Sequence, residues 1–157
     1  MKLSAQGTHL IASFEGFVPT WYDDGTGVQT IGYGHTGPLP AGVKPPLTVA
    51  QGLTVLGLDA AQAAAAVNAG LKVRLGVIPA RAQARFDALV SLTYNIGGGA
   101  FQSSSLLGEI NRKGAPRDWT SCGPLWLEWD HAGGKVLPGL LARRQREFRI
   151  FASGKYL

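Results

Sequence analysis

Apolar residues recur at helical spacing through most of the second half of the chain. Phe86, Leu89, Val90 and Thr93 fall on one stripe of residues 80–96, and Pro79 stands where a first helical turn accepts proline. We therefore expect a long helix here, stopped by the glycines at 97–99. A second stripe predicts the last helix over 138–152. Shorter helices are expected over 59–73 with Asp59 as a candidate cap, over 103–112 ending at Gly114, and in pieces over 116–129 broken at Gly123–Pro124.

The first residues predict a helix from Ser4 to Glu15. Ser4 is a candidate N-cap, because a serine hydroxyl can accept a hydrogen bond from the first turn of a helix. Gly16 follows Glu15 at the position where helices favour a left-handed C-cap. Pro19 then blocks further helix.

Residues 20–35 carry the only strong β signal. The segment 23–27 has the turn-forming sequence Asp-Asp-Gly-Thr-Gly, and residues 28–35 after it look extended, which predicts a hairpin. Strand alternation then puts Thr30, Gly32 and Gly34 on one face. Residues 37–46 are rich in glycine and proline and form an irregular connector. The pattern as a whole predicts a mostly α, α+β fold with a small β-hairpin.

Length and composition indicate one globular domain. The chain has 157 residues, of which 45% are hydrophobic and 16% charged. No apolar run approaches the roughly 18 to 20 residues of a membrane span, and the N-terminus lacks the apolar core of a signal peptide. The single cysteine, Cys122, excludes an internal disulfide framework, and the three histidines show no zinc-ligand spacing. We expect no metal and no cofactor.

Positive charge is concentrated at the C-terminal end. Residues 1–110 have six basic and six acidic residues, whereas residues 111–157 have nine basic and four acidic ones. A basic tail suggests a polyanionic partner, but no nucleic-acid-binding motif accompanies it. Within the last predicted helix, the arginines favour a helix packed on the core with a basic outer face, or alternatively a membrane-active amphipathic helix. These arginines are Arg143, Arg144, Arg146 and Arg149.

Two carboxylates in contrasting surroundings are the candidate chemistry. Glu15 is expected in the last turn of a helix, where the helix dipole and desolvation by Phe14 and Phe17 favour the protonated acid. Asp24 lies in a polar, glycine-rich turn that offers N–H donors and favours the ionised form. Such a pair meets the requirement for hydrolysing a glycosidic bond. The hydroxyl of Thr30, six residues further on, could share a water with Asp24.

This arrangement resembles the phage-type lysozyme, or endolysin, family (glycoside hydrolase family 24). Residues 88–97, 101–107 and 137–147 are similar to the family more weakly, and the resemblance is poorest over 39–80. The residues that carry the strong match are Phe14-Glu15-Gly16 and Tyr22-x-Asp24-x-x-Gly27-x-x-Thr30-x-Gly32-x-Gly34-His35.

The resemblance implies a lysozyme-like fold of two lobes around a cleft, in one catalytic domain over 1–157. The β lobe would cover about 16–40, and the helical lobe about 47–157 plus the N-terminal helix. It also implies inverting hydrolysis of the β-1,4 bond between N-acetylmuramic acid and N-acetylglucosamine in peptidoglycan. Glu15 would be the general acid, and Asp24 and Thr30 would position the attacking water.

Further residues match positions that bind substrate in the family. Gly34, His35, Tyr94, Asn95 and Ser104 would line the cleft, although a lone histidine such as His35 is more often structural. Arg143 matches a basic residue that pairs with the catalytic glutamate. That pairing would favour the ionised Glu15, in tension with the helix-end argument, unless bound glycan displaces the arginine or excludes water.

The family also implies a partner and a place of action. We expect a monomer that acts on bacterial peptidoglycan, without nucleic acid or stable membrane insertion. The family picture keeps such an enzyme in the host cytoplasm, with no signal peptide, until a holin opens the membrane. Two alternatives stay open: a lytic transglycosylase, which needs one acid and no water-activating partner, and a non-catalytic glycan-binding domain.

Overall fold

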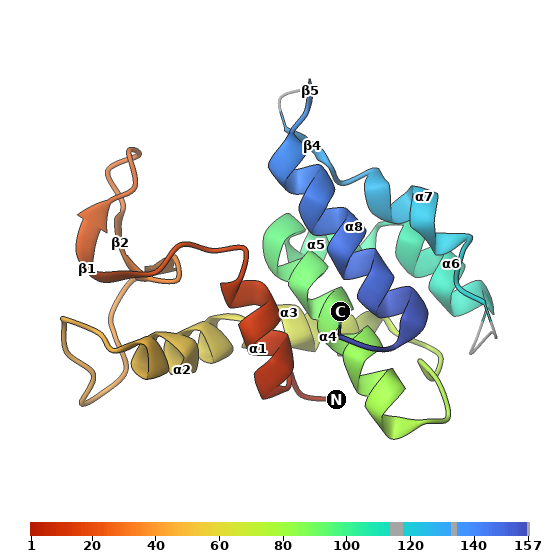
Figure 1. The fold of residues 1–157 in the computed structure, drawn as a ribbon, viewed down its shortest axis with the longest axis horizontal. Coiled ribbons are helices and arrows are strands. Elements are labelled where there is room, and N and C mark those ends of the chain that lie inside the picture. The colour runs from red at the N-terminus through yellow and green to blue at the C-terminus, as the bar shows by residue number, and fades with distance from the viewer. Residues whose placement is uncertain (114–117, 133–134, 157) are drawn as a thin grey trace.

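The computed structural model describes residues 1–113, 118–132 and 135–156, and places a small β-sheet beside a larger group of helices (Figure 1). The sheet and α2 lie on one side of α1, and α4 to α8 lie on the other. The elements are α1 (Ala5–Ala12), β1 (Val18–Asp23), β2 (Gln29–Gly32), β3 (His35–Thr36), α2 (Val49–Asp59), α3 (Ala61–Gly70), α4 (Pro79–Ile96), α5 (Gly98–Gln102), α6 (Ser105–Lys113), α7 (Cys122–Leu127), β4 (His131–Ala132), β5 (Lys135–Val136) and α8 (Pro138–Ser153).

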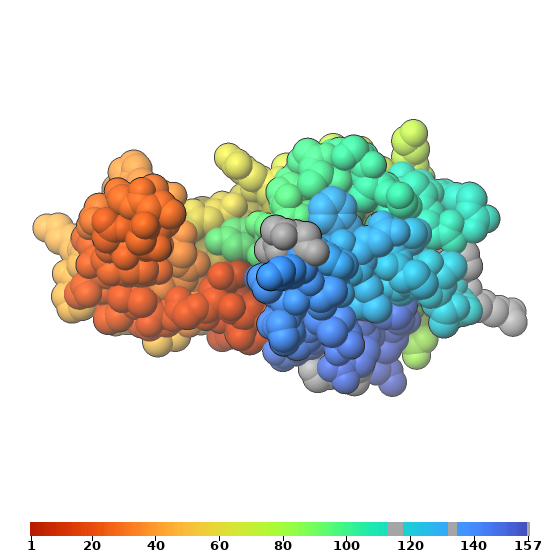
Figure 2. All heavy atoms as spheres, turned by 90° about the horizontal axis from the view of Figure 1, so that it is seen from above, coloured from red at the N-terminus to blue at the C-terminus, as the bar shows by residue number. Residues whose placement is uncertain are grey.

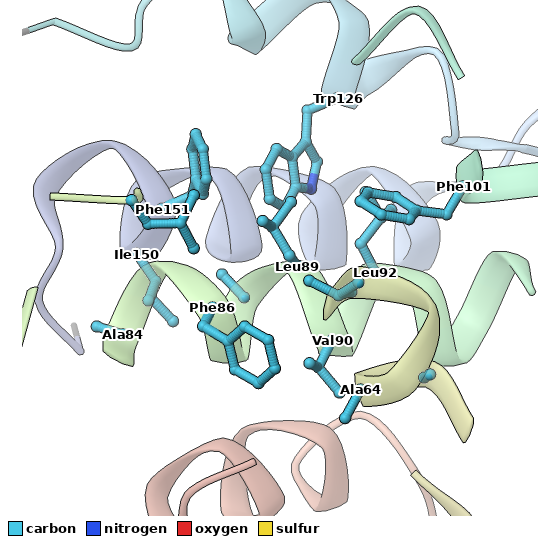
Figure 3. Close-up of a cluster of buried hydrophobic side chains, with 14 of the residues drawn as sticks. Ala64, Ala84, Phe86, Leu89, Val90, Leu92, Phe101, Trp126, Ile150 and Phe151 are labelled. Atoms are coloured by element: carbon cyan, nitrogen blue, oxygen red, sulfur yellow. The ribbon is translucent and has the colours of Figure 1, made fainter. Parts of the chain in front are cut away.

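Helix α4 is the centre of the helical part. Every residue from Ala84 to Thr93 is buried, because α1, α3, α5 and α8 pack around it. In Figure 3, Trp126 and Phe101 lie on one side of α4, and Phe86 and Val90 lie on the other, towards α1. The Trp126 ring centroid is 5.0 Å from that of Phe151 on α8. The predicted helix over 80–96 and its buried stripe are confirmed.

The hairpin forms a three-stranded antiparallel sheet in the order β1–β2–β3. Tyr22 pairs with Thr30, and Asp23 pairs with Gln29. The prediction of one extended segment over 28–35 is wrong, because the chain turns at residues 33–34, where Gly34 has a φ of 90°. The strand alternation that put Gly34 on the face of Thr30 therefore does not hold.

Helix α1 ends earlier than its sequence predicts. Ser4 is its N-cap, as expected, and its hydroxyl accepts from the Gly7 N–H. The helix stops at Ala12, with Ser13 rather than Gly16 as C-cap. The Ser13 hydroxyl donates to the Leu10 carbonyl at 2.7 Å and competes with the helical pattern. Glu15 thus lies three residues beyond α1, and Gly16 does not have the positive φ of the expected cap.

Other helix boundaries differ for local reasons. Asp59 ends α2 instead of capping α3, whose N-cap Ala60 makes no side-chain hydrogen bond. Helix α7 runs through Gly123–Pro124, because Pro124 stands in the first turn, where its missing N–H has no helical partner to lose. The expected stop at Gly114 and the start of the 116–129 segment lie outside the described residues. The pattern also missed α5 and the short β4–β5 pair.

Helix α8 confirms the last predicted helix but not its predicted outer face. Arg143 and Arg144 are buried at 5% and 0% exposure, whereas Arg149 is exposed. The basic outer face is therefore wrong for two of its arginines, because both turn inwards to Glu147. The same burial counts against a membrane-active helix. Among the described residues, no helix combines the length and the apolar character that crossing a membrane requires.

Candidate active site

Glu15 lies in the turn after α1 and is held from α8. Its Oε1 accepts a hydrogen bond from Nη1 of Arg143 at 2.9 Å. The Glu15 side chain is 27% exposed and that of Arg143 only 6%, so the carboxylate is the more accessible partner. The ion pair expected from the family resemblance is present.

Aromatic and polar contacts fix the same turn on α8. The Arg143 guanidinium lies 4.8 Å from the Phe14 ring centroid, and that of Arg146 lies 5.5 Å from it. Arg146 also donates to the Ser13 hydroxyl at 2.9 Å. The surroundings of Glu15 are therefore set by α8, and the helix-dipole argument for a protonated Glu15 does not apply.

Asp24 lies in the turn between β1 and β2 and is exposed. Its Oδ1 accepts from the Thr26 hydroxyl at 2.7 Å and from the Thr26 backbone N–H at 2.8 Å. The hydroxyl bond, followed by the backbone bond, holds the pKa of Asp24 below its usual value. The expectation of an ionised Asp24 with N–H donors is confirmed. Asp23 instead accepts from the N–H groups of Gly25 and Gly27, which shapes the turn.

Thr30 is buried at 4% exposure, and its hydroxyl donates to the Val28 carbonyl at 3.2 Å. The same carbonyl accepts from the Asp24 backbone N–H at 3.3 Å. One backbone oxygen therefore ties Asp24 and Thr30 together across the hairpin. Because the Thr30 hydroxyl donates its hydrogen to the Val28 carbonyl, its oxygen is left to act as a hydrogen-bond acceptor.

Two hollows of about 420 and 360 Å³ share Asp59, Gln62 and Tyr94 in their walls. Gly34 lines the larger hollow with Thr36, so two predicted cleft residues, Gly34 and Tyr94, meet there. Burial, followed by the negative charges of Asp59 and Glu15, raises the pKa of Tyr94 to about 12. Tyr94 thus lines both hollows and lies close enough to Glu15 for the charge of that carboxylate to raise its pKa. Among the described residues that line the two hollows, Glu15, Asp24 and Thr30 are absent.

The remaining predicted cleft residues are engaged with protein groups. His35 Nδ1 lies 3.0 Å from each carboxylate oxygen of Asp59, which joins β3 to the end of α2. The Ser104 hydroxyl accepts from the Leu107 N–H and acts as a cap for α6. Asn95 is exposed, and its side-chain oxygen accepts from Arg144.

Sequence reasoning missed several residues at this site. Asp59, Gln62 and Thr36 line the larger hollow, but they lie in or next to the stretch where the resemblance is poorest. Glu147, which is fully buried, was not singled out. Its spacing of three and four residues from Arg144 and Arg143 is the signal that predicts their ion pairs on one helix.

The hairpin and the C-terminal half occupy opposite ends of an elongated molecule seen from above (Figure 2). Within the described residues, no three histidine, cysteine, aspartate or glutamate side chains gather closely enough to hold a metal ion. The sequence model of the phage lysozyme family matches residues 12–147, which include Glu15, Asp24, Thr30 and Arg143. The chain belongs to the phage lysozyme family.

Individual relatives agree with this assignment. The chain is 36% identical to the endolysin of Acyrthosiphon pisum secondary endosymbiont phage 1, over 98% of its own length and 99% of that relative. It is 38% identical to the endolysin of Bacillus phage PZA, but spans only 56% of that longer protein. A solved structure of a phage P22 lysozyme variant superposes with a TM-score of 0.81 at 30% identity, covering 96% of this chain and 98% of that one. The α+β lysozyme-like fold is confirmed.

Proposed function

We propose that this phage lysozyme family member is a muramidase that hydrolyses the β-1,4 bond between N-acetylmuramic acid and N-acetylglucosamine in peptidoglycan. One observation carries the proposal: two carboxyl groups that match the family motif have opposite surroundings. Glu15 is partly buried against Arg143, and Asp24 is exposed with a lowered pKa. A partly buried carboxyl group as the acid and an exposed one as the base suit glycoside hydrolysis.

In this mechanism Glu15 donates a proton to the leaving glycosidic oxygen, and the C1–O bond breaks as a water attacks from the opposite face. Asp24 accepts a proton from that water, and the Thr30 oxygen accepts its second hydrogen bond. Attack from the opposite face inverts the anomeric carbon, and no covalent sugar intermediate forms.

The ion pair with Arg143 must loosen before Glu15 can act as an acid. A sugar that fills the site removes water from the 27% exposed Glu15 side chain and competes for the Arg143 donor. Desolvation disfavours a charged carboxylate, so Glu15 takes up a proton from solvent as the glycan binds and holds it for the leaving oxygen.

Peptidoglycan is the proposed partner, and the protein acts on it as a monomer, without nucleic acid and without stable insertion in a membrane. As a phage lysis protein it would be kept in the host cytoplasm and released to the wall when a holin opens the membrane. The net charge of +5 favours approach to an anionic wall.

The test is digestion of purified sacculi by the parent and by Glu15→Gln. We expect the variant to fold normally and to release muropeptides at least about 100-fold more slowly, because the general acid is gone. Glu128→Gln, at an exposed glutamate after α7, is the matched control and should keep the parental rate.

The chemical ends of the released muropeptides distinguish hydrolysis from the two alternative functions. Reducing muramic acid ends support hydrolysis, whereas anhydro-muramic ends make the protein a lytic transglycosylase. Binding to sacculi without any released muropeptide from the parent makes it a glycan-binding domain. Equal rates for Glu15→Gln and the parent contradict the acid assignment.

A further inference from the structure

Glu147 on α8 is a fully buried carboxylate, and each of its two oxygens accepts hydrogen bonds from two donors. Oε1 accepts from the Ser91 hydroxyl at 2.7 Å and from Arg143 Nε at 3.0 Å. Oε2 accepts from Arg144 Nη1 at 2.6 Å and from the Trp126 indole at 3.3 Å. Burying a charged cluster is weak evidence for stability, because apolar residues of similar size often serve a core as well. The cluster therefore calls for another explanation.

The first arm of the cluster leads to Glu15. The guanidinium of Arg143 uses three nitrogens on three acceptors: Nε on Glu147, Nη2 on the Ser91 carbonyl at 3.2 Å, and Nη1 on Glu15. Because the guanidinium is planar and rigid, fixing Nε and Nη2 fixes the direction of Nη1. Glu147 and the backbone of α4 thus aim Arg143 at Glu15.

The second arm leads to Asn95. Arg144 has no exposed surface, and while Nη1 donates to Glu147, Nη2 donates to the Asn95 side-chain oxygen. Asn95 is exposed near the end of α4, next to Tyr94, which lines both hollows. Burial lowers the pKa of Arg144, and the charge of Glu147 opposes this effect. The same carboxylate therefore supports two adjacent arginines, one of which reaches Glu15 and the other Asn95.

We propose that Glu147 is a positioning residue, which holds Arg143 against Glu15 and Arg144 against Asn95 and so sets the geometry of the active site. This inference rests on the proposed function, which makes Glu15 the general acid, and on the family resemblance, which implies a cleft position for Asn95. The competing explanation is that Glu147 only neutralises two buried arginines. The two explanations differ in whether the position of the carboxylate matters or only its charge.

Glu147→Asp separates charge from position, because it keeps the negative charge but shortens the side chain by one methylene. We expect kcat on sacculi fragments to fall at least about tenfold per folded molecule, since a 1 Å misplacement of a catalytic group can cost up to about 100-fold. Glu147→Gln should lower kcat at least as much. Arg144→Met removes the contact with Asn95 and one donor to Glu147 Oε2, but leaves the Arg143 bond to Oε1 in place, so it should raise KM more than it lowers kcat.

Arg85→Met is the matched control for loss of a buried arginine. Arg85 lies on α4 and donates to the backbone carbonyls of Leu75, Phe151 and Ala152; among the described residues its hydrogen bonds do not reach Glu15 or Glu147. This variant should be less stable yet keep the parental kcat and KM when it is assayed well below its unfolding temperature. A kcat in Glu147→Asp equal to that of the parent overturns the positioning role.

A crystal structure of Glu147→Asp gives a readout that does not depend on activity. An Arg143–Glu15 distance beyond 4 Å supports the proposal, whereas an unchanged 2.9 Å contact overturns it. If neither Glu147 variant folds, the carboxylate is structural and the proposal fails. An inactive parent contradicts the proposed muramidase, while the distance still decides whether Glu147 positions Arg143.

Discussion

Asp24 and Glu15 are held by partners that lie at very different distances along the chain. Asp24 is held within its own hairpin, whereas Glu15, in the turn after α1, is held by α8. Asp24 accepts from Thr26, two residues away, and the turn is exposed to solvent. Glu15 accepts from Arg143, 128 residues away, and that arginine is buried. The groups that surround Asp24 therefore come from its own hairpin. The cation beside Glu15 is in place only after α8 has packed on α4.

This difference predicts that the two regions respond to mutation in opposite ways. Around Glu15, function and stability share the same buried groups, so a substitution there affects both. Around Asp24, the bonds are local and exposed, and removing one changes chemistry with little effect on the free energy of unfolding.

The largest expected effect is on stability, in Arg143→Met. This change removes the cation that lies between Glu15 and Glu147 and leaves a buried carboxylate short of one partner. We expect the free energy of unfolding to fall by about 3 to 5 kcal/mol, and the unfolding midpoint by roughly 10 °C. Chemical and thermal denaturation followed by circular dichroism measure both.

Arg149→Met is the matched control for this change, because Arg149 lies on the same helix but is exposed. Its effect should stay within about 0.5 kcal/mol. If Arg143→Met costs less than about 1 kcal/mol, the buried cluster does not couple Glu15 to the stability of the fold, and the contrast between the two regions is lost.

The next effect is on activity, in Asp24→Asn. The amide keeps an oxygen that can accept from both Thr26 donors, so the turn should survive and the free energy of unfolding should stay within about 0.5 kcal/mol. Loss of the proposed base should slow muropeptide release about 100-fold or more. Asp23→Asn at the neighbouring residue is the control. The Asp23 side chain accepts from the N–H groups of Gly25 and Gly27, and an amide oxygen can accept the same two bonds. Equal losses of activity in the two variants would mean that the spacing does not single out Asp24.

The same contrast separates what the sequence can predict from what it cannot. Local patterns in the sequence identified features that depend on residues a few positions away. These are the backbone N–H donor to Asp24, the N-cap Ser4 and the helix that begins at Pro79. The prediction of where α1 ends was wrong, because the Ser13 hydroxyl donates to the Leu10 carbonyl and the pattern of apolar residues does not reveal such a bond.

Side-chain burial on α8 shows the other limit. Arginines are mostly exposed in proteins, so a basic outer face was the natural expectation for Arg143 and Arg144. Their burial depends on Glu147 in the same helix and on Ser91 and Asn95 in α4. The helical spacing to Glu147 is visible in the sequence, but the contacts with α4 follow from tertiary packing. The family resemblance supplied the pair between Arg143 and Glu15, which local physics alone did not.

The smallest expected effect tests the hairpin side of the contrast, in Thr26→Val. Valine has nearly the shape of threonine and keeps the backbone N–H, but it removes the hydroxyl that contributes most to the lowered pKa of Asp24. A lowered pKa keeps a carboxyl ionised at more acidic pH, so removing that donor raises the pKa and protonates Asp24 earlier as the pH falls. The acid limb of activity on sacculi should therefore move to higher pH, with the rate near neutral pH unchanged. The midpoint of the pH titration of the Asp24 carboxyl ¹³C resonance should move in the same direction. If that resonance shifts while the acid limb stays in place, a group other than Asp24 controls the acid side of the reaction, and the local electrostatics of the hairpin do not set its chemistry.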